Sequence, residues 1–409
     1  MSLLPPPGVA RSLCVQSLVY AIGNGVFTTG SAVFFLHVAG LSPVQVGIGF
    51  SVAGALSLLC SVPLGGLADR FGGRRVWLAG VLAEAFILLW YPWAHGFAAF
   101  LALLPLAGLA DGLAGSGRAV YQAEVLPRED RVRSLAFVRS AMNIGFFAGG
   151  ALAAVPLAIG SDWAYRMMVL GNALGLLVNA VLVARMPEPP DTARAERAAG
   201  PVRRGAVWRD RPFLALVALC SVLAGHASLT TEVIPLWLTA RTDAPRVMLA
   251  VLFGCNTIMC VALQVLASRG ADTPAGIGRA LRRGGLAVAA SCAVLYLSGH
   301  STGWATIALL LAGSALVTLG ELWQSAGFWG VTTELPPAAA RGEYVGAARM
   351  SYGVQGMFGP ASLTFLAMHG GGLGWLAIAA VFLLATAIVG PAMTWVTATP
   401  RVALTTATA

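Results

Sequence analysis

Twelve apolar stretches, each about 20 residues or longer, run through this chain of 409 residues. Lipid offers no hydrogen-bond partner to the backbone, so stretches of about 20 apolar residues predict helices that cross a bilayer. Only 11% of the residues are charged, whereas soluble domains carry about 25%. The expected fold is therefore an all-α membrane protein. Its predicted spans are 12–37, 44–67, 75–95, 97–122, 133–158, 164–185, 212–238, 246–268, 281–299, 303–331, 344–368 and 373–396.

The arginines orient these spans. All 26 basic residues are arginine, and they gather in the connections that follow even-numbered spans. These groups are 70–75, 128–133, 194–211, 269–283 and Arg341, whereas the connections after odd-numbered spans hold Arg166, Arg241 and Arg246. An excess of arginine marks the cytoplasmic side. Both termini are therefore predicted in the cytoplasm, with the chain as a multi-pass protein of a bacterial inner (plasma) membrane. The net charge of +9 then needs no nucleic acid partner.

The chain divides into two related halves. A polar stretch at 188–211, rich in proline and arginine, predicts a flexible cytoplasmic linker between an N-terminal six-helix bundle at 1–187 and a C-terminal one at 212–409. A shift of 210 residues, without a gap, aligns the halves. It pairs Asp111 with Glu321, Gly117 with Gly327, Glu124 with Glu334, Pro127 with Pro337, Arg131 with Arg341, Arg139 with Arg349 and Gly149 with Gly359. Such a register indicates internal duplication, and parallel repeats around a shared site are a known plan of transporters.

The connection between the second and third spans carries a motif, GGLADRFGGRR at 65–75. It resembles motif A of the major facilitator superfamily, G-x-L-A-D-R-x-G-R-R, and departs from it at Gly73, where a basic residue is usual. Glycine lets helices turn and approach closely, and an aspartate can pair across helices or cap a helix N-terminus. The resemblance implies two pseudo-symmetric six-helix bundles. It also implies that the cytoplasmic side is closed in the outward-open state by Gly65, Asp69, Arg70, Gly72 and Arg74.

The tenth and eleventh spans, from Gly320-Glu321 to Gly359-Pro360, resemble the drug:proton antiporter branch of that superfamily, with its LmrP-like and MdtH-like exporters. In that branch an acidic residue of the tenth span serves proton coupling or cation binding, and Glu321 occupies this position. Glu232 lies in the seventh span, where such exporters also carry an acid. The glycines before Pro360 resemble the exporters' antiporter motif, which normally lies in the fifth span; ordinary packing of small residues is the alternative explanation.

Ionisable side chains at membrane depth are costly unless they are paired, neutralised or hydrated, so each is a functional candidate. Four acids qualify: Glu84, Asp111, Glu232 and Glu321. Glu321 ranks first because it lies near the middle of its span and its repeat counterpart, Asp111, is also acidic. The resemblance implies that the first, fourth, seventh and tenth spans line a central cavity, so a structural role is favoured for Glu84 in the third span.

Other polar residues complete the candidate site. The set predicted for proton coupling or substrate binding is Glu321, Glu232, Asp111, Asn24, Gln324, His226 and Trp323. Structural hydrogen bonds are the alternative for His226, and a local network with its threonine neighbours is the alternative for Glu232. Arg118, Arg139 and Arg349 are expected to form gating or structural pairs, with Asp111, Glu124 or Glu334 as partners.

These features predict a proton-coupled secondary transporter that exports small amphipathic or drug-like molecules as an antiporter, by alternating access. An uptake symporter for a small nutrient is the alternative, and the direction of flux relative to the proton gradient separates the two. A polytopic membrane enzyme or a non-transporting sensor is disfavoured, since no nucleophile–base pair or metal-ligand spacing is found and the five histidines are scattered. We expect no enzymatic activity, cofactor or metal. The expected form is a monomer whose partners are the substrate, protons and the lipid bilayer.

Overall fold

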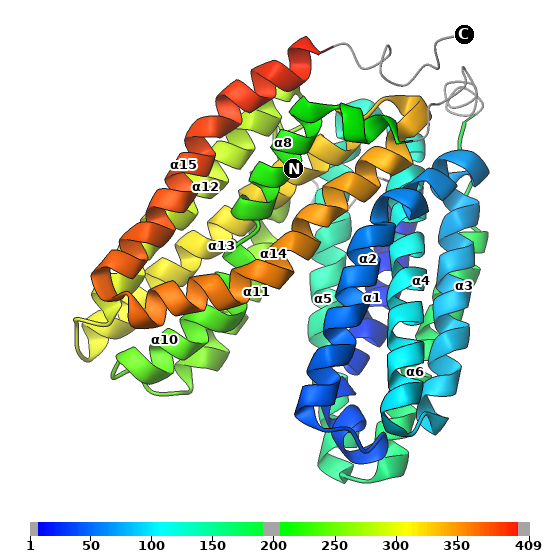
Figure 1. The fold of residues 1–409 in the computed structure, drawn as a ribbon, viewed down its shortest axis with the longest axis horizontal. Helices are drawn as coiled ribbons and strands as arrows, with labels where there is room; N and C mark the ends of the chain where they lie inside the picture. Colours follow the sequence, from blue (N-terminus) through cyan, green and yellow to red (C-terminus); the bar gives the residue numbers. More distant parts are fainter. Residues whose placement is uncertain (1–6, 191–204, 400–409) are drawn as a thin grey trace.

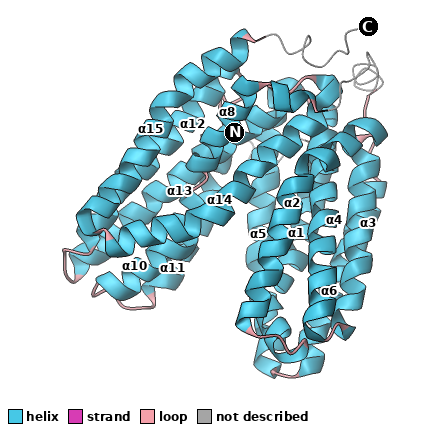
Figure 2. Cartoon of the chain, viewed as in Figure 1, coloured by secondary structure: helices cyan, strands magenta, loops and turns pink. Residues whose placement is uncertain are grey.

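The computed structural model describes residues 7–190 and 205–399, and the regular elements in these ranges are helices (Figure 2). The first half contains six long helices. They are α1 (Val9–Val33), α2 (Pro43–Phe71), α3 (Gly73–Trp90), α4 (Gly96–Val125), α5 (Arg131–Ile159) and α6 (Asp162–Ala184). Three short segments join them: η1 (Phe34–Val38), η2 (Tyr91–Trp93) and η3 (Arg128–Asp130).

The second half also crosses six times. Its first span, Arg211–Arg241, is interrupted by a turn at Ala224–Gly225. It is made of α8 (Arg211–Leu223), α9 (His226–Ser228), the π-helical turn η5 (Leu229–Val233) and α10 (Ile234–Arg241). The remaining spans are α11 (Met248–Ala267), α12 (Pro274–Ser298), α13 (Trp304–Thr333), α14 (Arg341–His369) and α15 (Gly371–Ala398), with short segments η4 (Ala206–Arg209) and η6 (Ala338–Ala340).

The predicted fold of twelve spans is confirmed. Within the described residues, nine segments are by themselves long and apolar enough to cross a membrane. The helices α1, α11 and α14 complete the twelve. One predicted boundary is wrong: the ninth span begins at Pro274, not at 281, because Thr273 caps the helix by accepting the N–H of Gly276 at 3.1 Å. The arginines expected in that loop, at 279–283, therefore lie on the first turns of α12.

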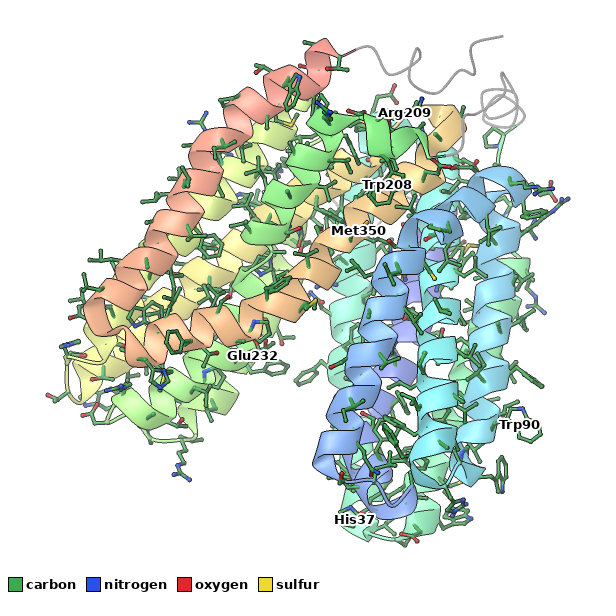
Figure 3. All side chains as sticks on the ribbon, in the orientation of Figure 1. His37, Trp90, Trp208, Arg209, Glu232 and Met350 are labelled. Carbon is green, nitrogen blue, oxygen red and sulfur yellow. The ribbon has the colours of Figure 1, made fainter. Side chains whose placement is uncertain are left out.

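The helices form two bundles that touch at one end and diverge toward the other (Figure 1). The helix α2 packs on α14 and α5 packs on α11, and the 210-residue repeat relates these two contacts. Each bundle has its own buried apolar core. The joined end holds the start of α1, the end of α15 and the segment η4, whose Trp208 and Arg209 lie there, while His37 lies at the diverging end (Figure 3).

The predicted linker at 188–211 can be compared with the structure only at its two ends, since residues 191–204 lie outside the described residues. After that gap, Ala206–Arg209 form a 3-10 helix instead of the flexible chain expected there. Asp210 then caps α8 by accepting the N–H of Phe213 at 3.0 Å, and it also accepts the hydroxyl of Tyr344 at 3.0 Å. The domain limits 1–187, 188–211 and 212–409 stay a prediction.

Candidate functional site

Asp69 joins the two bundles at their closed end. Its carboxylate, at the end of α2, accepts the N–H groups of Gly342 at 2.6 Å and Glu343 at 3.0 Å. These are orphan donors in the first turn of α14, where the helix dipole also favours a negative charge. The sequence left open whether Asp69 pairs across helices or caps a helix, and the structure has it capping a helix of the other bundle.

Glycines allow this contact. A Cβ added to Gly65 would overlap the backbone of Gly342, and a Cβ on Gly342 would overlap the backbone of Gly65, so α2 and α14 touch backbone to backbone. Gly72 turns the chain from α2 into α3 with a φ of 91°, which favours glycine. The motif therefore supplies both the turn and the close approach.

The motif arginines contribute differently. Arg74 donates to the carbonyl groups of Val183, at 3.4 Å, and Ala184 at the end of α6, and its guanidinium lies 3.5 Å from Glu188. It therefore ties α3 to α6 within the first bundle. Arg70 is exposed and lies over the ring of its neighbour Phe71, with 5.2 Å to the centroid.

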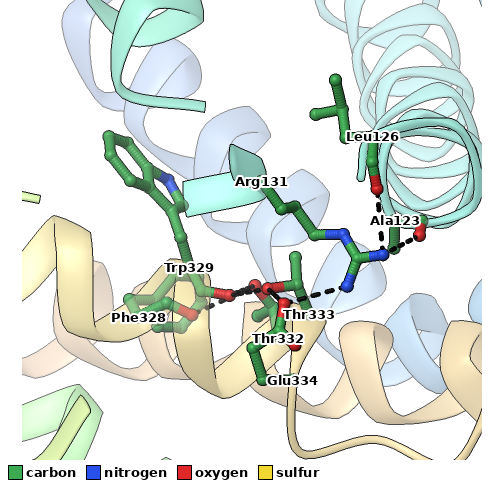
Figure 4. A network of polar contacts seen from close by, with 8 residues as sticks. All are labelled: Ala123, Leu126, Arg131, Phe328, Trp329, Thr332, Thr333 and Glu334. Carbon is green, nitrogen blue, oxygen red and sulfur yellow. Dashed lines mark hydrogen bonds and ion pairs between the residues drawn. The ribbon is translucent and has the colours of Figure 1, made fainter. Parts of the chain in front are cut away.

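A buried ion pair also crosses between the bundles at the closed end (Figure 4). Arg131 of α5 donates to Glu334, just after α13, at 2.9 Å, and the side chains are only 5% and 14% exposed. Its other nitrogen donates to the carbonyl groups of Ala123, at 2.7 Å, and Leu126, at 3.1 Å, at the end of α4. Both terminal nitrogens of Arg131 thus bond within the protein, as expected of a structural pair.

Two further ion pairs cross between the bundles at membrane depth. Arg139 of α5 lies 3.6 Å from Glu321 of α13, and Arg349 of α14 lies 3.9 Å from Asp111 of α4. The repeat relates the two pairs. They are longer than the Arg131 pair, and their side chains are 17–47% exposed. The partner of Arg139 was not among those expected: this arginine meets the first-ranked proton-coupling candidate.

A chain of hydrogen bonds extends from Asp111 along α1. Tyr20 donates its hydroxyl to Asp111 at 3.3 Å, and Asn24 donates to the Tyr20 hydroxyl at 2.9 Å. The guanidinium of Arg118 lies over the Tyr20 ring, with 5.6 Å to the centroid. The structure thus brings three candidates, Asp111, Asn24 and Arg118, together around Tyr20.

A second group surrounds Glu321. Asn256 of α11 donates to Glu321 at 3.3 Å and to Thr318 at 3.0 Å. Gln324, one turn further along α13, is buried, and its Oε1 lies 3.3 Å from Nε2 of His226 in α9. Trp323 is partly exposed.

Glu232 and Glu84 stand apart from these groups. Glu232 lies in the π-helical turn η5, on the side of its bundle that faces the other one (Figure 3). Its neighbours Thr230 and Thr231 donate their hydroxyls to the backbone carbonyl groups of His226 and Ala227, at 3.1 and 2.9 Å, and not to Glu232. Glu84 is 8% exposed, and in both acids Oε2 has no hydrogen-bond partner.

Two of the cavities along the bundle interface are lined by candidate residues of the site. The larger, of about 580 Å³, is lined by Glu321, Arg139, Asn143, Asn256, Thr28 and Phe146, among others. It therefore involves the first, fifth, eighth and tenth spans, whereas the resemblance implied the first, fourth, seventh and tenth. The smaller, of about 180 Å³, includes Arg118, Arg139, Arg349 and Gln122 in its wall. Arg139 is common to both.

The sequence model of the family described as Major Facilitator Superfamily matches residues 13–360. The chain belongs to the major facilitator superfamily. Among curated relatives, the probable anion transporter 3, chloroplastic, of Arabidopsis thaliana is 30% identical over 122 residues, 29% of this chain and only 23% of that protein. The uncharacterized MFS-type transporter YdeE of Escherichia coli (strain K12) is 21% identical over 353 residues, 83% of this chain and 84% of YdeE.

The superfamily fold is also found among solved structures. The proton:xylose symporter XylE, bound to 6-bromo-6-deoxy-D-glucose, matches with a TM-score of 0.71 at 14% identity, over 94% of each chain. At that identity the likeness shows the fold alone. The family match over residues 13–360 makes the chain a transporter of the major facilitator type, and the residues of its own interface must indicate what it carries.

Sequence reasoning missed several residues of this superfamily member's interface. Tyr20 and Asn256 each contact a leading acid, and both are polar groups in otherwise apolar predicted spans, which was a usable signal. The role of Gly115 had no such signal in the sequence. It depends on a contact with the other bundle, since a Cβ at Gly115 would overlap the guanidinium of Arg349.

Proposed function

We propose that this transporter is proton-coupled and works by alternating access, with Glu321 and Asp111 as its proton-carrying groups. The observation that carries the proposal is the pair of repeat-related ion pairs, Arg139 with Glu321 and Arg349 with Asp111. Each joins an acid of one bundle to an arginine of the other. A proton on either acid removes the charge that attracts its arginine, so protonation weakens the attachment between the bundles.

Protonation of these acids can therefore shift the equilibrium between the two conformations. A ligand shifts an equilibrium between two states only by binding one of them better. With the closed end held by Asp69 and the Arg131 pair, the described conformation is joined at the side predicted to be cytoplasmic. Protons that enter from the open side reach the partly exposed acids and favour the state in which their arginines are released. The proposed membrane is the bacterial inner membrane, with both termini cytoplasmic and the protein acting as a monomer.

Two directions of transport fit this scheme. Export of small amphipathic or drug-like molecules by antiport is the first candidate, supported by the resemblance of the tenth and eleventh spans to drug:proton antiporters. Uptake by proton symport is the second. A proton:xylose symporter has the same fold, which supports symport as the second candidate.

The test uses the full chain in proteoliposomes loaded with a pH-sensitive dye. A substrate gradient should move protons, and an imposed pH gradient should drive substrate: outward against proton entry for antiport, inward with it for symport. Glu321→Gln and Asp111→Asn should each uncouple the two fluxes, while Glu129→Gln, an exposed acid at the closed end, should not. Proton movement that is unchanged in both variants would refute the proposal, and unchanged coupling in Glu232→Gln would remove Glu232 from the site.

A further inference from the structure

Arg118 differs from the other arginines of the bundle interface. Arg131, Arg139 and Arg349 each hold a carboxylate. Among the residues that the structure describes, Arg118 has no carboxylate within 4 Å, and its contact is the face of the Tyr20 ring. It is only partly buried. Its guanidinium lies in the wall of a cavity, where it is available to a ligand.

Two cavities meet at Arg139, and Arg118 lines the smaller one. The smaller cavity, about 180 Å³, gathers Arg118, Arg139 and Arg349 with the neutral polar side chain of Gln122. Arg139 also lines the cavity of about 580 Å³, whose wall includes the rings of Phe146, Phe147 and Phe253. A polar head fits the first space and a small apolar body fits the second.

The charges of the site leave one positive charge unbalanced. Three guanidinium groups face two carboxylates, Asp111 and Glu321, each already opposite an arginine. Glu84 lies nearby on α3, where it is buried, and among the described residues its Oε2 accepts no hydrogen bond and no arginine lies within 4 Å of its carboxylate. Burial of an unpaired carboxylate is costly, so we count Glu84 as neutral. A single negative charge on a ligand would complete the balance.

We infer that the substrate is a small amphipathic anion, with a carboxylate or sulfonate head that binds Arg118 between Arg139 and Arg349. This deepens the proposed transport function and rests on it. Arginine suits such a head because its planar fork donates two parallel hydrogen bonds to it. A cationic substrate fits less well, since both acids that would attract it are already opposite arginines.

The inference also bears on the direction of transport. The titratable side chains around these arginines are Tyr20, Glu84, Asp111, His226, Cys260, Glu321 and Tyr352. A proton on Glu321 or Asp111 releases an arginine, which then binds the anion, so proton and anion reinforce each other's binding. Both then travel in the same direction. Of the two directions proposed, an anionic substrate favours uptake by symport.

The test measures binding to the full-length protein in nanodiscs by tryptophan fluorescence, since Trp329 lines the arginine cavity. The probes are benzoate and benzenesulfonate, with benzamide as the neutral match and benzylammonium as the cation. Both anions should bind saturably and at least about tenfold more tightly than benzamide. Arg118→Gln should weaken the anions by about tenfold to a hundredfold, as expected for lost charged hydrogen bonds, and leave benzamide unchanged. Arg118→Lys should fall between.

Arg282→Gln, at an exposed arginine of α12, is the matched control and should bind like the wild type. The inference is overturned if benzamide or benzylammonium binds as tightly as the anions, if neither anion saturates, or if folded Arg118→Gln keeps wild-type affinity. The comparison of probes on the wild type decides the matter even where Arg118→Gln does not fold. Because binding is measured without a proton gradient, anion binding without coupled flux would refute the proposed function alone. Coupled flux without anion preference would refute only this inference.

Discussion

Asp111 and Glu321 hold equivalent positions in the two bundles, and each lies opposite an arginine of the other bundle, at 3.9 and 3.6 Å. The two related halves thus form a crossed pair of contacts between the bundles and not two contacts within them. Since each half supplies both an acid and an arginine, the attachment between the bundles is symmetric. Protonation at either acid loosens one side of it.

The Arg139–Glu321 pair should be weak enough to exchange. We expect a double-mutant cycle of Arg139→Gln and Glu321→Gln to give a coupling energy of about 0.5–1 kcal/mol, as is typical of partly exposed ion pairs. The readout is the equilibrium between the two conformations, followed by the distance between fluorescent labels on the diverging ends. A coupling energy above about 3 kcal/mol, the range of buried pairs, would mean that the pair is structural.

The Arg131–Glu334 pair should matter for stability. Arg131→Gln leaves a largely buried carboxylate without its cation, which costs about 3–5 kcal/mol, so the thermal unfolding temperature should fall markedly. Replacement of both partners, as Arg131→Met with Glu334→Leu, should recover much of the loss because no charge is then stranded. If the single and double variants are equally unstable, the hydrogen bonds of Arg131 to the carbonyl groups contribute more to stability than its ion pair with Glu334.

Asp69→Asn should loosen the closed end. The neutral amide keeps one acceptor but loses the charge that binds the first turn of α14, which we expect to cost about 1–2 kcal/mol, roughly a tenfold shift toward the opposite conformation. Labels on the connections before α3 and α14 would report it. Asp130→Asn, at the same end but paired with Arg133 of its own bundle at 3.8 Å, is the control and should leave the distance unchanged.

Gly65→Ala should separate the bundles, whereas Gly66→Ala should not. A Cβ at Gly65 would overlap the backbone of Gly342, but one at Gly66 would lie at an ordinary 3.6 Å from the Glu343 side chain. Overpacking of this kind costs about 1–3 kcal/mol. Label distances at the closed end should therefore widen for Gly65→Ala alone. An equal response of both variants would point to helix propensity as the cause.

Gly115→Ala should impair transport more than stability. Its Cβ would overlap the guanidinium of Arg349, the far end of a flexible side chain that is able to move away from Asp111. We expect the unfolding temperature to stay within about 2–4 °C of the wild type, as for a change of about 1 kcal/mol, and proton-coupled flux to fall severalfold. Gly108→Ala on the same helix meets nothing closer than 4.0 Å and should behave like the wild type. A fully active Gly115→Ala would show that the Arg349–Asp111 pair is dispensable.

Much of the fold could be predicted because bilayer physics acts on short stretches of sequence. Twelve runs of apolar residues predicted twelve spans, and the motif at Gly65–Arg74 led to the family. The start of α12 was misplaced because arginine was treated as a loop residue, although Thr273 and Pro274 together form a helix start. Helix ends depend on capping, which hydropathy does not register.

The candidate site was only half visible in the sequence. Glu321 and Asp111 stood out since a charged group in an apolar span is costly. Their partners did not, because ion pairing depends on which helices of the two bundles face each other. Arg139 was expected to pair elsewhere, and Tyr20 and Asn256 were overlooked as isolated polar residues.

The sequence by itself determined that the chain crosses a membrane twelve times as two repeated halves, because apolar length and duplicated residues are properties of the chain alone. Only the tertiary structure decided that the acids and arginines pair between the bundles, and that Arg118 faces a cavity without a carboxylate. These relations depend on the rotation of each helix about its axis and on the packing of one bundle against the other. Both are determined by contacts between residues that lie far apart in the sequence.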